Sequence, residues 1–131
     1  MSLAPAPGYV PGRHLIDAYG AGGFRFAGMS HVGSILATPR GVSAVAAQNL
    51  SELRLESFAP LMAEIAEAPR SVDLLVIGLG EKMARLPAPL ANRLRAAGLR
   101  LEVMATGPAS RIYNVLVSEN RRVAALLLAA P

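Results

Sequence analysis

Two short stretches of the sequence contain residue types that bind anions in many proteins, and the first is Gly78-Leu79-Gly80. These glycines directly follow the apolar run 72–77, which predicts a buried strand. In an open α/β sheet, ligands lie outside the carboxyl ends of the strands, and glycines there let a backbone approach a phosphate. The dinucleotide fingerprint requires a third glycine where this chain has Met83. A turn that ends the strand is therefore the better interpretation.

The second stretch runs from Thr106 to Asn114, where a predicted helix begins. The first turn of a helix presents free N–H groups and a partial positive charge, which suits an anion. Ser110 and Arg111 can add donors, and Arg111 shares a helix face with Asn114. In the structural alternative, Thr106 or Gly107 caps the helix and Arg111 pairs with a carboxylate. The ligand-binding or interaction candidates from both stretches are Gly78, Gly80, Thr106, Ser110, Arg111 and Asn114.

Other catalytic chemistry has little support in the sequence. The chain has no cysteine, which excludes a disulfide, a thiolate nucleophile and a cysteine-ligated metal. His14 and His31 are its two histidines, and neither has further ligands at a spacing typical of zinc sites. No G-x-S-x-G nucleophile elbow is present. We therefore predict no catalytic residue, no metal and no cofactor, and the sequence favours a protein that is not an enzyme.

The net charge of +4 is unevenly distributed along the chain. Residues 1–80 hold five arginines against six acidic residues, whereas residues 81–131 hold Lys82 and seven arginines against three acidic residues. A basic surface can bind nucleic acid, but the chain has no tryptophan, only 5% aromatic residues and no recognised nucleic-acid motif. We expect no nucleic-acid partner. The excess of arginine fits either a solvated face or a protein interface.

The N-terminal part predicts an arm and a small antiparallel meander. Prolines at positions 5, 7 and 11 disfavour a helix or a ladder strand, so we expect a flexible arm over 1–13 and a single domain over 14–131. Residues 15–19, 24–26 and 31–36 read as three short strands separated by glycine-rich turns. No secretory signal or membrane-spanning stretch is evident. We expect a soluble, cytoplasmic protein that is peripheral to a membrane at most, with an oligomer possible.

The C-terminal part alternates predicted strands and helices. Strands are expected at 52–55, 72–77, 99–104 and 122–128. A first helix follows Ser57 as its N-cap, a second ends before Gly98, and a third begins near Thr106 and buries Ala109, Ile112 and Leu116. This order predicts an α/β fold, namely a single compact domain whose mixed, largely parallel sheet is flanked by helices and joined to the N-terminal meander.

An ordered set of short segments covers about residues 15–128, and together they are similar to one known family. The segments are Ile16-Asp17-Ala18-Tyr19-Gly20, Gly23-Phe24-Arg25-Phe26, Ser34-Ile35-Leu36, Leu75 to Gly80, Leu86-Pro87, Gly98 to Met104, Thr106 to Arg111, Tyr113-Asn114 and Arg121 to Ala125. They resemble a family of small α/β domains of unknown biochemical activity. That family includes the mitochondrial assembly factor three of respiratory complex I.

The resemblance implies a compact α/β domain with a mixed sheet. It also implies a role in complex I assembly, which is known for mitochondrial members, whereas bacterial members are mostly uncharacterised. Ala105 stands where relatives often have Asp, and Ser110 where they often have Cys. These departures disfavour catalysis at the helix start.

The leading hypothesis is therefore a non-catalytic interaction or assembly protein whose partners include respiratory-complex subunits or assembly proteins. The alternative is a small-molecule or anion-binding domain, possibly an enzyme, that uses the Gly78–Gly80 turn and the Arg111 helix start.

Overall fold

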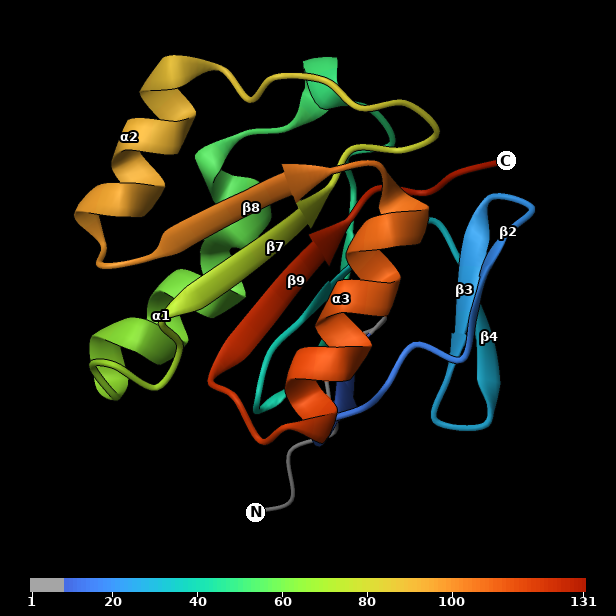
Figure 1. Ribbon diagram of the computed structural model, residues 1–131, viewed down its shortest axis with the longest axis horizontal. Helices are drawn as coiled ribbons and strands as arrows, with labels where there is room; N and C mark the ends of the chain where they lie inside the picture. The colour runs from blue at the N-terminus through green and yellow to red at the C-terminus, as the bar shows by residue number, and fades with distance from the viewer. Residues whose placement is uncertain (1–8) are drawn as a thin grey trace.

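The computed structural model describes residues 9–131, which form two sheets and three α-helices (Figure 1). The larger sheet has the strand order β1-β6-β5-β9-β7-β8. Its strands are β1 (Tyr9–Pro11), β5 (Ser34–Ala37), β6 (Gly41–Val45), β7 (Leu74–Gly78), β8 (Arg100–Met104) and β9 (Val123–Leu127). The smaller sheet contains β2 (Ala18–Gly20), β3 (Gly23–Phe26) and β4 (Met29–Val32). The helices are α1 (Ala59–Glu67), α2 (Ala88–Ala96) and α3 (Thr106–Ser118).

The larger sheet is mixed, as predicted, and its parallel part is confined to one side. Strand β7 pairs in parallel with both β8 and β9. The pairs β9–β5, β5–β6 and β6–β1 are antiparallel. The central strand expected at 72–77 is β7, which lies between two neighbours and is buried over its last four residues. The carboxyl ends of β7, β8 and β9 therefore meet at one edge, beside the start of α3.

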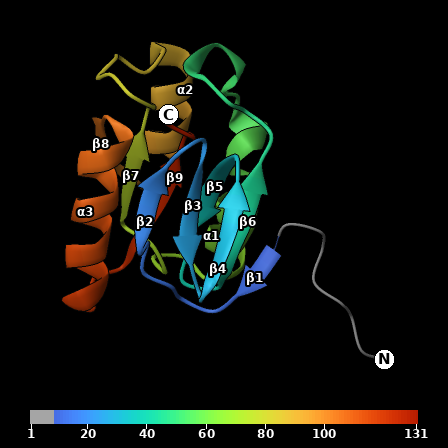
Figure 2. The same ribbon diagram turned by 90° about the vertical axis from the view of Figure 1, so that its right-hand side faces the viewer.

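The sheet is covered on both faces, so the domain has three layers (Figure 2). Helices α1 and α2 cover one face through a core that includes Phe58, Leu61 and Leu94. On the other face, α3 and the small sheet share a second core with Phe26 and Tyr113. The central strands β5, β7 and β9 are almost wholly apolar, because residues on both of their faces are buried. No helix among residues 9–131 has the length and apolar character needed to cross a bilayer.

The N-terminal meander is confirmed as β2-β3-β4, with two differences from the prediction. Its first strand begins at Ala18 rather than at residue 15. The expected strand over 31–36 is two strands in different sheets, because Gly33 separates them with a φ of +103°. Glycine is the residue that adopts this left-handed conformation without strain, and it redirects the chain into the larger sheet.

Two further predictions of local structure are wrong. Residues 52–55 do not form a strand, since two 3-10 helices, η1 (Leu50–Glu52) and η2 (Leu55–Phe58), occupy this region. Ser57 does not cap α1; its hydroxyl accepts the backbone N–H of Arg54 at 3.1 Å within η2.

The arm expected over 1–13 forms a strand at Tyr9–Pro11, which pairs with β6. An edge strand tolerates Pro11 because one side of its backbone needs no partner. The rest of that arm, residues 1–8, lies outside the described residues.

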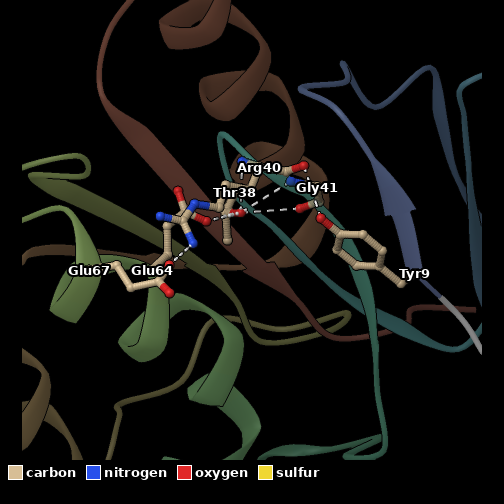
Figure 3. Close-up of polar contacts among 6 residues, drawn as sticks. All are labelled: Tyr9, Thr38, Arg40, Gly41, Glu64 and Glu67. Atoms are coloured by element: carbon tan, nitrogen blue, oxygen red, sulfur yellow. Dashed lines mark hydrogen bonds and ion pairs between the residues drawn. The ribbon is translucent and has the colours of Figure 1, made fainter. Parts of the chain in front are cut away.

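A polar cluster closes the turn between β5 and β6 against α1 (Figure 3). Thr38 donates its hydroxyl to the buried carboxyl group of Glu64 at 2.7 Å. Arg40 forms an ion pair with Glu67, and this hydrogen-bonded carboxylate raises the pKa of the Arg40 guanidinium. Tyr9 donates its hydroxyl to the Arg40 carbonyl at 3.1 Å. The cluster therefore joins β1, the β5–β6 turn and α1. Its hydrogen bonds and its ion pair connect residues of the same chain.

Candidate functional site at the start of helix α3

Gly78 lets α3 approach the sheet closely. It is the last residue of β7, and a Cβ at this position would lie 2.8 Å from Thr106 Cα and 3.0 Å from Ala109 Cβ. The first of these contacts is with helix backbone, which cannot move aside as a flexible side chain can. The Gly78 carbonyl accepts the N–H of Leu128 at 2.9 Å. Gly78 therefore has a packing role, and its polar group faces a neighbouring segment of the chain.

Thr106 connects the start of α3 to the ends of two strands. Its hydroxyl donates to the Leu128 carbonyl at 2.7 Å and accepts the Gly80 N–H at 2.9 Å. Its own N–H donates to the Gly80 carbonyl at 2.8 Å. Thr106 is completely buried, so these groups have no access to water. Gly80 adopts a φ of +91°, which directs both its N–H and its carbonyl to this one residue. We call these contacts of Gly80, Thr106 and Leu128 the Thr106 clamp.

The clamp uses donors that an anion would need. A helix N-terminus binds anions through the free N–H groups of its first turn. Here the Thr106 N–H is bonded to Gly80, Pro108 has none, and the Ala109 N–H donates to the Ala105 carbonyl at 3.0 Å. Gly107 supplies the first-turn N–H that no such bond occupies. One amide is a weak basis for holding a phosphate.

Three other side chains of α3 also serve the fold. Ser110 is buried and donates its hydroxyl to the Thr106 carbonyl at 2.9 Å. Asn114 accepts the Ile16 N–H at 2.8 Å and donates to the Ile16 carbonyl at 2.7 Å. Its amide thereby pairs with the backbone as a neighbouring strand would. Tyr113 donates its hydroxyl to the His14 carbonyl at 3.1 Å, and burial raises its pKa to about 12. Asn114 and Tyr113 thus fasten the segment that leads into the small sheet.

The outward face of α3 differs from the one predicted. Ile112 was expected in the buried stripe, but its side chain is 39% exposed and Tyr113 occupies the core instead. Val115 is 56% exposed, and Pro108 and Arg111 are exposed as well. Positions 108, 111, 112 and 115 follow the i, i+3, i+4 spacing of one helix face. We call these four residues the α3 outer stripe.

A small cleft lies beside the Thr106 clamp. Its volume is about 230 Å³, and its lining includes Tyr19, Gly80, Glu81, Gly107 and Pro108. A Cβ at position 107 would overlap the Tyr19 hydroxyl, so Gly107 allows this tyrosine to pack over the helix start. Of the six predicted candidates, Gly80 lines the cleft. Thr106 and Ser110 are buried, and neither Arg111 nor Asn114 belongs to its lining.

The structure therefore brings Gly78, Gly80 and Thr106 together, but it does not gather all six candidates around one cavity. Sequence reasoning missed Tyr19, which reaches the helix start from the small sheet. Tyr19 is remote from Gly107 along the chain, so no local spacing signals this contact. It also missed the buried pair of Thr38 and Glu64. A glutamate within an otherwise helical apolar pattern was the available signal for that pair.

Comparisons with known proteins place these features in a family. The model of the family described as Protein of unknown function (DUF498/DUF598) matches residues 16–128. An uncharacterized protein of Rhodobacter capsulatus is 43% identical over 130 residues, which cover 98% of this chain and 95% of that protein.

A functionally named relative and a solved structure are also similar. The NADH dehydrogenase (ubiquinone) 1 alpha subcomplex assembly factor 3 of Xenopus tropicalis is 31% identical over 114 residues. The match covers 87% of this chain and 60% of the assembly factor, so the chain spans less than two thirds of that relative. The crystal structure of an outer membrane protein from Bartonella henselae is similar with a TM-score of 0.85 at 40% identity. That match covers 92% of this chain and 98% of the other.

Replacing Thr106 with valine tests the structural role of the clamp. Thr106→Val keeps the shape of the side chain but leaves the Gly80 N–H and the Leu128 carbonyl buried without this partner. We expect the free energy of unfolding to fall by about 2–4 kcal/mol. Thr106→Ser keeps the hydroxyl and should lose only about 1 kcal/mol, from the missing methyl group. Urea unfolding of both variants measures this difference, and equal losses would contradict the clamp.

The raised pKa of Tyr113 predicts a loss of stability in alkali. The folded protein holds this phenolic proton to about pH 12, whereas the unfolded chain releases it near the ordinary value of 10.0. Between these values the unfolded state binds fewer protons, so the free energy of unfolding falls as the pH rises, by roughly 2–3 kcal/mol in total. Chemical unfolding between pH 9 and pH 12 should show this slope. Tyr113→Phe should lack this part of it; an unchanged slope would contradict the assignment.

Proposed function

The chain belongs to the family described as Protein of unknown function (DUF498/DUF598), and from this membership we propose that it is a non-catalytic assembly factor that binds a protein partner. Relatives with a functional name include NADH dehydrogenase assembly factors from Xenopus tropicalis and Danio rerio. The partner we propose is a respiratory-complex subunit or another assembly protein. We do not attribute the complete activity of the longer assembly factors to this chain, because the chain spans 60% and 65% of their lengths.

The observation that carries the proposal is the contrast between the two sides of α3. On the inner side, the polar groups of Thr106, Ser110 and Asn114 are bonded within the chain. On the outer side, the α3 outer stripe presents apolar side chains to solvent around Arg111. Protein interfaces are enriched in arginine and bury apolar side chains at their centre. This combination suits recognition of a protein better than chemistry on a small molecule.

Binding of a small molecule or anion is the second candidate function, and the cleft beside the Thr106 clamp favours it. Gly80 and Gly107 line this cleft, and the Tyr19 side chain is 44% exposed there. The cleft of about 230 Å³ is smaller than the roughly 300 Å³ at which ordinary ligand pockets begin. The first-turn donors of α3 are also largely used. We therefore rank this function below partner binding.

The proposed location is the cytoplasm, with at most a peripheral contact with the membrane. The Bartonella henselae protein of similar structure is named an outer membrane protein, and this description concerns that protein. A partner in a membrane complex would bring this chain to the bilayer surface, and no helix of residues 9–131 would have to span the bilayer. We propose no nucleic-acid partner.

Disruption of the α3 outer stripe tests the proposed function. The double variant Ile112→Asp/Val115→Asp places two charges on the stripe, and desolvating them in an interface is costly. We expect affinity capture from the native organism to enrich respiratory-complex subunits or assembly proteins with the wild type, and this enrichment to fall about tenfold or more with the variant.

The matched control is Val32→Asp, because Val32 is 87% exposed on β4 and lies outside the stripe. This control should retain the wild-type enrichment, and thermal unfolding should confirm that all three proteins are folded. The proposal fails if no respiratory subunit or assembly protein is enriched with the wild type. It also fails if the stripe variant and the control lose enrichment equally.

A further inference from the structure

Strand β8 forms one margin of the larger sheet, and two of its five residues direct their backbone groups away from the sheet. The Arg100 N–H donates to the Asp73 carbonyl at 2.9 Å, and the Met104 carbonyl accepts the Leu79 N–H at 2.8 Å. The backbone groups of residues 100, 102 and 104 therefore point toward β7. Because these directions alternate along a strand, the N–H and carbonyl groups of Leu101 and Val103 point outward. β8 has β7 as its one neighbour among residues 9–131 (Figure 1).

The side chains of this edge strand carry opposite charges two residues apart. Arg100 and Glu102 are exposed and lie on the same face of the sheet. Leu101 and Val103 lie on the opposite face, where they pack beside the core formed with α1 and α2. Residues at an open edge often carry charges that discourage pairing with another strand. One positive and one negative charge on the same face can instead favour pairing. An antiparallel strand with the same two charges places each charge opposite one of the other sign.

The alternation of backbone groups limits the registers in which two copies of β8 can pair. When a two-fold axis perpendicular to the sheet relates the two copies, odd-numbered residues must lie opposite odd-numbered residues, because these have the outward backbone groups. Centring the pair on Leu101 places Leu101 opposite Leu101 and Leu99 opposite Val103, with outward backbone groups facing each other. Arg100 then lies opposite Glu102 of the second copy, twice by symmetry. Arg100 and Glu102 of the second copy form a pair that exchanges no backbone hydrogen bonds. In such pairs the facing side chains approach each other most closely.

The neighbouring registers are worse for electrostatic reasons. Centring the pair on Glu102 places two glutamates opposite each other and leaves Arg100 opposite Met104. Centring it on Arg100 places two arginines opposite each other. Like charges that face each other directly across two strands are destabilising. The register centred on Leu101 is the one of these three that pairs every charge of β8 with its opposite.

We infer that β8 binds a second copy of this chain, through antiparallel edge-to-edge pairing centred on Leu101. The two sheets then form one continuous sheet across the two-fold axis. A hollow beside the edge, about 550 Å³, lies next to the joined strands, and its lining combines apolar residues such as Leu101, Val103 and the 74% exposed Met83 with Arg85 and Arg95. The interface uses neither the Thr106 clamp nor the α3 outer stripe, so it stands apart from the proposed function.

Charge exchange on the edge tests this pairing. Arg100→Glu gives an edge with two acidic residues, and Glu102→Arg gives an edge with two basic residues. Each variant alone replaces both cross-strand attractions with repulsions, so we expect the dimer dissociation constant to rise about tenfold or more. An equimolar mixture of the two variants restores opposite charges at both positions and should form heterodimers. The double variant Arg100→Glu/Glu102→Arg should dimerise like the wild type.

Sedimentation velocity at protein concentrations from about 10 µM to about 1 mM measures these association states. The matched control is Arg93→Glu, which makes the same charge change on an exposed position of α2 and should leave dimerisation unchanged. In parallel, amide exchange followed by NMR should show concentration-dependent protection of Leu101 and Val103. The amides of Arg100 and Glu102 should be protected at every concentration, because the first bonds to the Asp73 carbonyl and the second faces β7.

Three results on association would overturn the inference. The first is a wild-type protein that stays monomeric across the whole concentration range. The second is a dimer that both single charge changes leave intact. The third is a mixture of the two single variants that remains monomeric, since opposite charges would then have failed to restore the pair. Protection of the Leu101 amide that does not depend on concentration would also contradict a second copy as the occupant.

Discussion

The close approach of α3 to the ends of β7 and β9 is the constraint on which the rest of the fold depends. The helix can approach because position 78 has no side chain, and it is held because Thr106 bonds to residues from two strand ends. From this fixed helix, Tyr113 and Asn114 bind the backbone of residues 14–16. That segment leads into the small sheet, so the position of the sheet follows from the position of the helix. A single buried contact region thus organises one whole face of the domain.

The same constraint decides how the polar residues at the helix start should be interpreted. Glycines after a strand and a hydroxyl at a helix N-terminus form a phosphate cradle when their polar groups point into open space. Here the groups of Gly80 and Thr106 point at each other and at Leu128. Buried donors and acceptors that are paired in this way have little capacity left for a ligand. Our two proposals therefore concern surfaces of the domain, namely the outward side of α3 and the edge of β8.

Much of the C-terminal half could be predicted because its patterns are local. The apolar run before Gly78 predicted β7, and Gly98 correctly marked the end of α2. Ile112 was misplaced because an isoleucine suits a core as well as a tyrosine does, and the helix spacing alone does not choose between positions 112 and 113. The strand expected at 52–55 failed because alternation over four residues also fits consecutive 3-10 turns.

The sequence placed some of the candidate residues correctly at one edge of the sheet, and the binding role predicted for them stays a prediction. Gly78, Gly80 and Thr106 do meet, because the ends of parallel strands and the helix that follows them share one edge of a sheet. Their hydrogen-bond directions depend on Leu128, which arrives from a distant part of the chain. No local pattern in the sequence predicts that Leu128 lies beside Thr106. Tyr19 and Asn114 likewise gain their roles from contacts between remote segments.

The central claim is that the polar groups at the start of α3 hold the fold and do not bind a ligand. Titration of the protein with inorganic phosphate and with nucleotides, followed by NMR at the amides of Gly80, Gly107 and Arg111, tests this claim most directly. The account predicts no saturable change of chemical shift at these three amides and no rise in the melting temperature. Saturable shifts at Gly80 and Gly107, accompanied by thermal stabilisation, would contradict it.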